Sequence, residues 1–207
     1  LTSLLGYLET LSLKADRLTM EENKQYLNIA LRQGNKVRHL SQQLFELARL
    51  EHGGIKPQPE TFVLAELVQD VAQKFDLPIA TRNIGLRLEL ATGLPPITAD
   101  LSMIERVLTN LLDNAIRHTP EGGLIRLAAR RSGPEFIVEV ADSGPGIGSE
   151  LRATLFERPS VLAPGAQSAS RGGLGLMIVR RMLQLHGGDI RLLDAPAGAC
   201  FQFTLPV

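Results

Sequence analysis

The segment Asn110-Leu-Leu-Asp-Asn-Ala-Ile-Arg-His-Thr119 decides how the second half of the chain folds, because it places two amide side chains among apolar residues of a predicted helix. Asn110 and Asn114 are four residues apart and therefore lie on one helix face. Asparagine is unfavourable inside a helix, since its side chain competes for backbone hydrogen bonds. Amide oxygens on one face suit Mg²⁺, which takes oxygen ligands and keeps substrate phosphates in its shell. Taken alone, the pair is explained more simply as two solvent-facing asparagines.

A second motif, Asp142-Ser-Gly-Pro-Gly-Ile147, follows directly after a predicted strand. Gly144 and Gly146 let the backbone take unusual dihedral angles and approach a ligand closely. The Asp142 carboxylate can accept a hydrogen bond from an exocyclic amine such as adenine N6. The alternative is a plain turn, because Asp, Ser, Gly and Pro are all turn residues.

A third motif, Arg171-Gly-Gly-Leu-Gly-Leu176, opens a predicted helix. Glycines at a helix N-terminus expose amide groups and bring the positive end of the helix dipole against a phosphate. A single glycine cluster of this kind is a weak signal, so its weight depends on the other two motifs.

Hydrophobic periodicity predicts the elements around these motifs. The segment Ile147–Arg171 has weak periodicity and is rich in Ser, Ala, Pro and Gly. The remaining pattern indicates a mixed sheet with helices covering one face. The predicted helices are Thr61–Phe75, Asp100–Arg117 and Gly173–His186, and the predicted strands are Ile84–Leu90, Leu124–Arg130, Phe136–Ala141, Ile190–Leu193 and Cys200–Leu205.

The N-terminal part of the chain has a different pattern, typical of two helices. Apolar residues at spacings of three and four form a seam: Leu1, Leu4, Leu8, Leu11, Ala15 and Leu18. The segment Thr19-Met-Glu-Glu22 has the form of a capping box and predicts the start of a second helix, which ends near His52-Gly-Gly54. Two narrow seams favour a four-helix bundle with a second copy, and the alternative is an intramolecular bundle.

Composition excludes several classes of partner. The chain has 207 residues with 22 Lys and Arg and 22 Asp and Glu, so its net charge gives no electrostatic case for nucleic acid or a membrane surface. The single cysteine, Cys200, cannot form an internal disulfide and fits a reducing compartment. No apolar run has the length needed to span a bilayer.

The order of the motifs resembles that of the GHKL ATPases and, among them, the sensor histidine kinases of two-component systems. The resemblance implies an α+β chain: a helical hairpin that forms half of a dimeric four-helix bundle, then a two-layer α/β sandwich of the GHKL (Bergerat) type. The segments that resemble family motifs are Asn110–Thr119 (N box), Asp142–Ile147 (G1 box), Leu155–Arg158 (F box), Gly173–Leu176 (G2 box), Gly198–Pro206 (closing strand) and Leu1–Leu11 (end of dimerisation helix one).

The resemblance also implies domains and site residues. Residues 1–54 would be the dimerisation hairpin, 55–60 a linker and 61–207 the ATP-binding domain. Asn114 would hold Mg²⁺ with help from Asn110, Asp142 would bind adenine, and the segment Ile147–Arg171 would be a lid over the nucleotide. The full set expected at ATP is Asn110, Asn114, Arg117, His118, Asp142, Gly144, Gly146, Ile147, Phe156, Arg171, Gly173, Leu174, Gly175 and Leu176.

The chain also departs from the family pattern. The acceptor motif His-Glu-x-x-Thr-Pro is expected immediately before Leu1, and His39, His52 and His186 are poor substitutes for its histidine. Arg171 stands where the family often has a glycine, and we hypothesise that it supplies the lid's positive charge to the γ-phosphate. The fragment is therefore expected to bind ATP without phosphorylating itself.

Three functions follow from the resemblance. The first is a kinase core that transfers the γ-phosphate of ATP to a histidine, for relay to an aspartate on a response regulator receiver domain. The second is a degenerate nucleotide-binding module that acts as a dimeric regulator or phosphatase partner. The third, a DNA-repair or topoisomerase ATPase, is disfavoured because those relatives place a glutamate base where Asn110 stands. From the family alone, the intact protein is expected to be a bacterial inner-membrane protein with this part in the cytoplasm.

Overall fold

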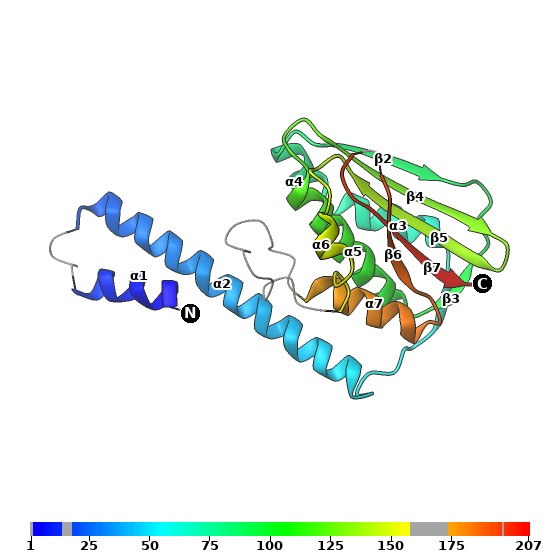
Figure 1. Cartoon of the computed structure of the whole chain (residues 1–207), viewed down its shortest axis with the longest axis horizontal. Helices are drawn as coiled ribbons and strands as arrows, with labels where there is room; N and C mark the ends of the chain where they lie inside the picture. The colour runs from blue at the N-terminus through cyan, green and yellow to red at the C-terminus, as the bar shows by residue number, and fades with distance from the viewer. Residues whose placement is uncertain (1, 14–17, 158–173, 196) are drawn as a thin grey trace. The chain divides into compact units, whose positions relative to one another are not determined.

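The structure is a computed structural model of the 207-residue chain, and it describes residues 2–13, 18–157, 174–195 and 197–207. The chain divides into two compact units, Leu1–Glu46 and Leu47–Val207 (Figure 1). Among the described helices, none combines the length and the apolar character that crossing a bilayer requires.

The first unit is a helical hairpin. Helix α1 spans Thr2–Leu13, and helix α2 spans Met20–Glu51, so that its last turn belongs to the second unit. The two helices lie side by side, with the rings of Tyr7 and Tyr26 5.9 Å apart between centroids (Figure 1). The prediction of a continuous helical seam to Leu18 is wrong, because Leu18 lies in a bend before α2. Ala15 lies outside the described residues.

The predicted capping box explains where α2 begins. The Glu22 carboxylate accepts from the Thr19 backbone N–H at 2.9 Å, and the Glu22 N–H donates to Thr19 Oγ1 at 3.2 Å. These reciprocal bonds satisfy two amide groups that the first helical turn leaves without partners. Hydrogen bonds from the Thr19 backbone and hydroxyl lower the pKa of Glu22. Thr19 is therefore the N-cap of α2, and the helix begins directly after it.

The predicted glycine cap ends α2. Gly53 has φ +69°, and the Gly54 N–H donates to Arg49 O at 2.9 Å. This is the bond of a Schellman motif, which needs a left-handed residue directly after the helix. The prediction that the helix stops at His52-Gly-Gly54 is confirmed.

Large apolar side chains remain exposed along the hairpin. Leu5 is 54% exposed and Leu31 is 63% exposed. Leu8, Leu13, Leu27, Leu44 and Phe45 are also exposed apolar residues of this unit. Among the described residues of the unit, only Ala30 and Gln43 are buried. A single copy of the hairpin therefore leaves much of its apolar surface in contact with water.

The second unit is built on the predicted mixed sheet. Its strand order is β2-β4-β5-β7-β6, in which only β2 and β4 pair in parallel. A tight turn with Gly133 at φ +60° joins β4 to β5. The strands are β2 Gly85–Leu90, β4 Leu124–Ser132, β5 Glu135–Asp142, β6 Ile190–Leu193 and β7 Cys200–Pro206.

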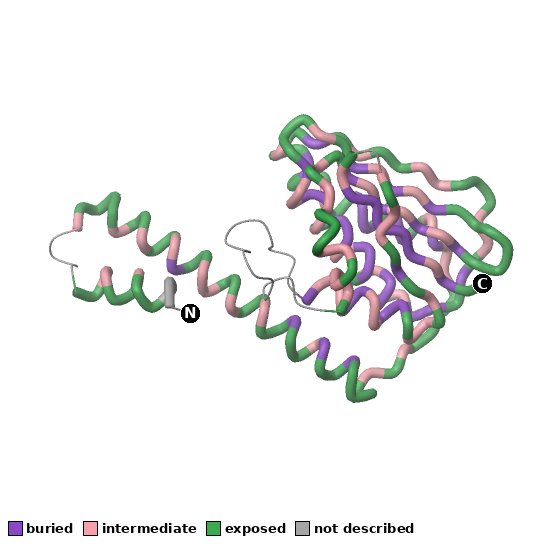
Figure 2. The backbone as a smooth tube through the Cα atoms, in the orientation of Figure 1, coloured by how far each residue is buried: buried purple, intermediate pink, exposed green. Residues whose placement is uncertain are grey.

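Helices form the other layer of this unit. Helices α3 (Leu64–Gln73), α5 (Leu101–His118) and α7 (Gly175–Leu185) share one apolar core with the sheet. Burial alternates along β4 and β5, so one sheet face supplies that core. Figure 2 shows buried backbone concentrated in α5 and the central strands. Two short helices, α4 (Asp76–Thr81) and α6 (Ser149–Arg152), also belong to this unit.

The predicted helix Thr61–Phe75 is partly wrong. Residues Glu60–Phe62 form strand β1, which pairs antiparallel with β3, Ile97–Ala99. Phe62 pairs with the buried Ile97. Strand pairing, and not a helix, therefore accounts for the position of this apolar residue. Tertiary pairing here prevails over local helical pattern, and helix α3 begins only at Leu64.

Asp100, which is buried, joins three segments that are far apart in the sequence through its carboxylate and its backbone N–H. It caps α5 by accepting from the Met103 N–H at 3.0 Å, and it accepts from the Gln58 N–H at 2.8 Å. The Asp100 N–H donates to His186 Nε2 at 3.0 Å, at the end of α7. Burial alone would raise the pKa of Asp100, but the hydrogen bonds from Gln58, Met103 and Ser102 outweigh it and the pKa lies below its ordinary value.

We expect Asp100→Ala to lower the free energy of unfolding by about 2 kcal/mol, because it removes a helix cap and leaves the Gln58 and Met103 amides without their acceptor. Urea unfolding monitored by circular dichroism measures the change. The folded-state pKa is depressed, so the stabilisation is present above the unfolded-state pKa and is lost as pH falls through the folded one. The difference in the free energy of unfolding between wild type and Asp100→Ala should therefore become smaller in acid. The exposed Asp70→Ala is the matched control, and an equal loss there would contradict this role for Asp100.

Candidate functional site

The site is centred on Asp142, the last residue of β5. Its side chain is buried, with 9% of the residue exposed. Asp142 Oδ1 accepts from the Gly144 N–H at 2.8 Å and from the Ala199 N–H at 3.4 Å. Burial raises the pKa of Asp142, while these two amides and the nearby His118 act in the opposite direction. Both amides donate to Oδ1 and orient the carboxylate, and among the described residues Oδ2 accepts no hydrogen bond.

Three glycines let the backbone pack closely around this carboxylate. A Cβ at Gly144 would lie 2.7 Å from His118 O, and one at Gly146, where φ is +76°, would lie 2.9 Å from Gly198 O. Gly198 has φ +72°, and a Cβ there would lie 1.7 Å from the backbone oxygen of Asp142. Only glycine fits such approaches. The turn after β5, the end of α5 and the start of β7 are therefore packed backbone against backbone.

The two asparagines lie on α5 as the spacing predicts, and both are half-buried. Asn110 Nδ2 donates to Arg106 O at 2.9 Å, which leaves Asn110 Oδ1 as the group that can meet a ligand. Asn114 lies four residues before His118 on the same helix, about one turn away. An amide oxygen on this part of α5 suits a hard cation or a polar ligand.

The C-terminal turn of α5 carries Arg117 and His118. Arg117 forms an ion pair with Asp113, one turn earlier. Burial lowers the pKa of His118, the Arg117 charge lowers it further, and the charges of Asp142 and Asp113 partly oppose this. Burial therefore disfavours the charged form of His118, and the ring lies close enough to Asp142 for the two groups to interact electrostatically.

The remaining predicted residues that the structure describes come from the segments before and after residues 158–173. Leu174 is buried before α7, and Gly175 and Leu176 begin that helix. Ile147 and Phe156 are partly buried against the core, and Phe156 packs edge-on against Phe201 with ring centroids 6.3 Å apart. Arg171 and Gly173 lie outside the described residues, as does most of the predicted lid, 158–171.

Some residues of the site were missed at the sequence level. Gly198 was recognised only as the start of a closing strand, yet its backbone contacts Asp142. Ser143 Oγ accepts from the Leu124 N–H at 2.9 Å, and this bond connects the turn after β5 to the first residue of β4. A glycine immediately before a predicted strand is the signal that could have identified Gly198. No local pattern distinguishes Ser143 from an ordinary turn serine.

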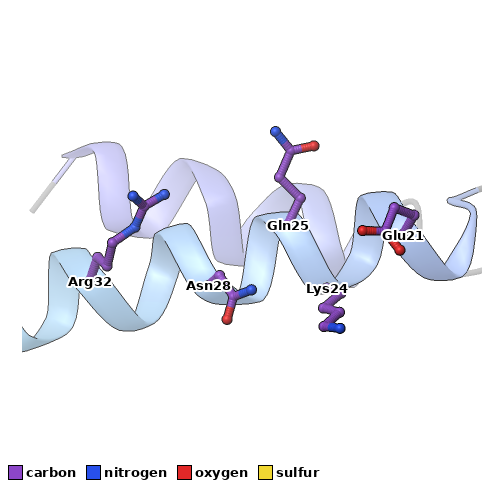
Figure 3. Close-up of a pocket in the computed structure, with 5 residues that line it drawn as sticks. All are labelled: Glu21, Lys24, Gln25, Asn28 and Arg32. Carbon is purple, nitrogen blue, oxygen red and sulfur yellow. The ribbon is translucent and has the colours of Figure 1, made fainter. Parts of the chain in front are cut away.

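A separate shallow pocket lies on the first unit. All of its lining residues come from α2, and Figure 3 shows their side chains directed away from the helix. These residues are Glu21, Lys24, Gln25, Asn28 and Arg32. None of them belongs to the predicted nucleotide motifs, so this pocket adds nothing to the site at Asp142.

Two family models match the chain. Residues 99–207 match the histidine kinase-, DNA gyrase B- and HSP90-like ATPases, the range that contains Asp142 and both asparagines. Residues 1–53 match the His kinase A (phospho-acceptor) domain. The chain belongs to the sensor histidine kinases. The second match separates this chain from the other ATPases that the first model covers.

Relatives support this assignment over different lengths. The kinase is 38% identical over 165 residues to the alginate biosynthesis sensor protein KinB of Pseudomonas aeruginosa, which is 79% of this chain and 27% of KinB. Histidine kinase ThkA in complex with response regulator protein TrrA is 26% identical with a TM-score of 0.80, covering 99% of this chain and 57% of that one. Full-length ShkA in complex with AMPPNP is 28% identical with a TM-score of 0.75, covering 99% and 43%. This chain thus spans about a quarter of the length of KinB.

Proposed function

We propose that this histidine kinase binds Mg-ATP at Asp142 and, within the whole protein, transfers the γ-phosphate to a histidine. One observation carries the proposal: a buried carboxylate is held by the Gly144 and Ala199 amides with its other oxygen available. An acceptor in this position suits the exocyclic amine of adenine. The complex of the relative ShkA with AMPPNP is consistent with an adenine nucleotide here.

Each predicted side chain then has a role in the proposal. Asn114, assisted by Asn110, places a neutral oxygen on Mg²⁺, with the phosphates completing the shell. Within the described ranges, no three His, Cys, Asp or Glu side chains gather as a metal site, so the cation would depend on amide and phosphate oxygens. Arg117 supplies positive charge near the phosphates, and Gly175 and Leu176 present the first turn of α7 to them. The other proposed nucleotide contacts are His118, Gly144, Gly146, Ile147, Phe156, Arg171, Gly173 and Leu174.

Phosphoryl transfer asks little covalent chemistry of the protein. Its transition state is stabilised by positioning and by positive charge on the phosphoryl oxygens. The metal supplies most of that charge when bound, and the residues of α5 orient the nucleotide. We propose that the accepting histidine precedes Leu1 in the whole protein, and that the phosphoryl group passes from it to a receiver-domain aspartate. The ThkA–TrrA complex supports this choice of partner.

The hairpin of residues 1–54 is proposed to form a four-helix bundle with a second copy. Its exposed apolar residues, such as Leu27 and Leu31, require cover that one copy does not supply. The match of residues 1–53 to the phospho-acceptor domain supports the same proposal. Residues 55–60 would link this hairpin to the nucleotide-binding domain of residues 61–207. The whole protein is proposed to be a bacterial inner-membrane sensor with this part in the cytoplasm.

Two measurements test the proposal. Isothermal titration of this chain with ADP and MgCl₂ should show one nucleotide per chain, and no heat of binding would rule out the nucleotide site. A longer natural chain that includes the residues before Leu1 should incorporate ³²P from γ-labelled ATP into an acid-labile phosphohistidine. Nucleotide binding without such incorporation would favour the dimeric regulator over the kinase.

A further inference from the structure

Arg82 caps the helix that carries the site, although it lies outside every nucleotide motif. It stands in the turn between α4 and β2, and its guanidinium donates to two carbonyl oxygens at the end of α5. One Nη donates to Ile116 O, and the other donates to Thr119 O at 2.8 Å. The last carbonyls of a helix have no partners within it and carry its negative dipole end. The Arg82 guanidinium donates to both carbonyl oxygens and also places a positive charge at the negative end of the helix dipole.

The backbone at Arg82 is itself fixed. Asn83 has φ +51°, the Asn83 N–H donates to Ala80 O at 3.0 Å, and the Ile84 N–H donates to Ile79 O at 3.0 Å. These two bonds and the left-handed residue form a Schellman motif. Ile79 and Ile84 are both buried in the core. The turn therefore presents the Arg82 side chain from a rigid base.

The residues between the two capped carbonyls belong to the site. They are Arg117 and His118, which the proposed function places at the nucleotide. His118 O lies against Gly144, where a Cβ would come within 2.7 Å of it. The Gly144 N–H in turn donates to Asp142 Oδ1 at 2.8 Å. A continuous series of contacts thus leads from Arg82 to the carboxylate proposed to bind adenine.

We propose that Arg82 is a positioning residue for nucleotide binding, acting through the C-terminal turn of α5 on the turn that follows Asp142. The proposal rests on the proposed function and extends it to a residue that does not touch the nucleotide. Without the guanidinium, Ile116 O and Thr119 O lose their donors. His118 O then no longer has a fixed position against Gly144, and the Asp142 carboxylate loses part of its orientation.

Substitution of Arg82 tests this with a matched control. Arg82→Gln should weaken ADP binding by about tenfold, since one charged double contact is lost while the nucleotide contacts remain. The ADP affinity of Arg82→Lys should lie between those of Arg82→Gln and wild type. A lysine ammonium can reach one of the two carbonyls, but it lacks the planar pair of donors that reaches both. Arg87→Gln is the control. Arg87 is exposed on β2, and among the described residues its ion pair is with the neighbouring Glu89, so the ADP affinity of this variant should equal that of wild type.

Amide spectra of the nucleotide-free chain separate positioning from general destabilisation. Heteronuclear NMR should show the Gly144 and His118 amides shifted in Arg82→Gln and unchanged in Arg87→Gln. An unshifted Gly144 amide, or equal ADP affinities for the two variants, would overturn the proposal. Should Arg82→Gln fail to fold, Arg82→Lys decides by the same two readouts. If wild type itself binds no ADP, the proposed function fails, while the spectra still test the contacts between Arg82 and Gly144.

Discussion

Asp142→Asn should reduce ADP affinity by about a hundredfold, which is the cost of replacing a charged acceptor by a donor in a buried site. In the variant, the amide oxygen keeps the two bonds from Gly144 and Ala199, because both are donated to one carboxylate oxygen. The new NH₂ group therefore takes the position of Oδ2. It would face the exocyclic amine of adenine, and two donors cannot satisfy each other.

Guanine provides a stringent test of this arrangement. It presents an O6 acceptor where adenine presents the N6 amine. The amide group introduced by Asp142→Asn can donate to that oxygen, so the preference of wild type for ADP over GDP should narrow or reverse. Isothermal titration with each nucleotide measures both affinities. Asp70→Asn, on the exposed side of α3, is the control and should leave them unchanged.

The same substitution should not cost stability at neutral pH. Burial raises the folded-state pKa of Asp142, so the folded protein retains the proton more strongly than the unfolded chain. Stability from this group is full below the unfolded-state pKa and is lost as pH rises through the folded one. Thermal melts at pH 7 should therefore show Asp142→Asn at least as stable as wild type, with the difference shrinking in acid. A variant that melts well below wild type would contradict the inferred desolvation of the carboxylate.

Gly198→Ala should be the most destabilising of the proposed substitutions, at about 3 kcal/mol in the free energy of unfolding. The left-handed backbone, with φ +72°, is one part of the cost. The larger part is steric, since the new Cβ would lie 1.7 Å from Asp142 O. The start of β7 must then move away from the end of β5. ADP binding should be lost together with stability, because the Ala199 amide that orients Asp142 moves too.

Gly133→Ala is the matched control for this prediction. Gly133 has a similar φ of +60°, but among the described residues beyond its two chain neighbours no atom lies within 4 Å of a Cβ placed there. Its substitution should cost about 1–2 kcal/mol, which is the contribution of the left-handed conformation alone. Urea unfolding of both variants gives the difference. Equal losses would mean that backbone conformation, and not the contact with Asp142, makes Gly198 necessary.

Much of the fold could be predicted because its signals are local. The Thr19–Glu22 capping box, the Gly53 cap and the alternation of β4 and β5 each depend on residues close in sequence. Strand β1 could not be predicted in this way. Its three residues gain their partners from β3, more than thirty residues later, so no periodicity within the segment shows the pairing.

The residues of the site likewise include some that local sequence motifs predict and some that they do not. The motifs Asn110–Thr119, Asp142–Ile147 and Arg171–Leu176 each consist of residues adjacent in sequence, and their order indicated the family. Gly198 and Arg82 escaped notice because their partners are backbone oxygens of distant segments. Residues of any type carry such oxygens, so nothing in the local pattern records the contact.

The passage of α2 from one unit into the other limits how this protein can be recombined. Its last turn places Leu47 and Leu50 in the core of the second unit, with Leu50 fully buried, and Arg181 Nε donates to Leu50 O at 3.3 Å. A chimaera joined in the proposed linker, residues 55–60, would replace these leucines with whatever the donor helix carries. A crossover placed before Leu47 would keep them. The modular unit that evolution or an engineer can exchange without disturbing the core therefore begins inside a helix.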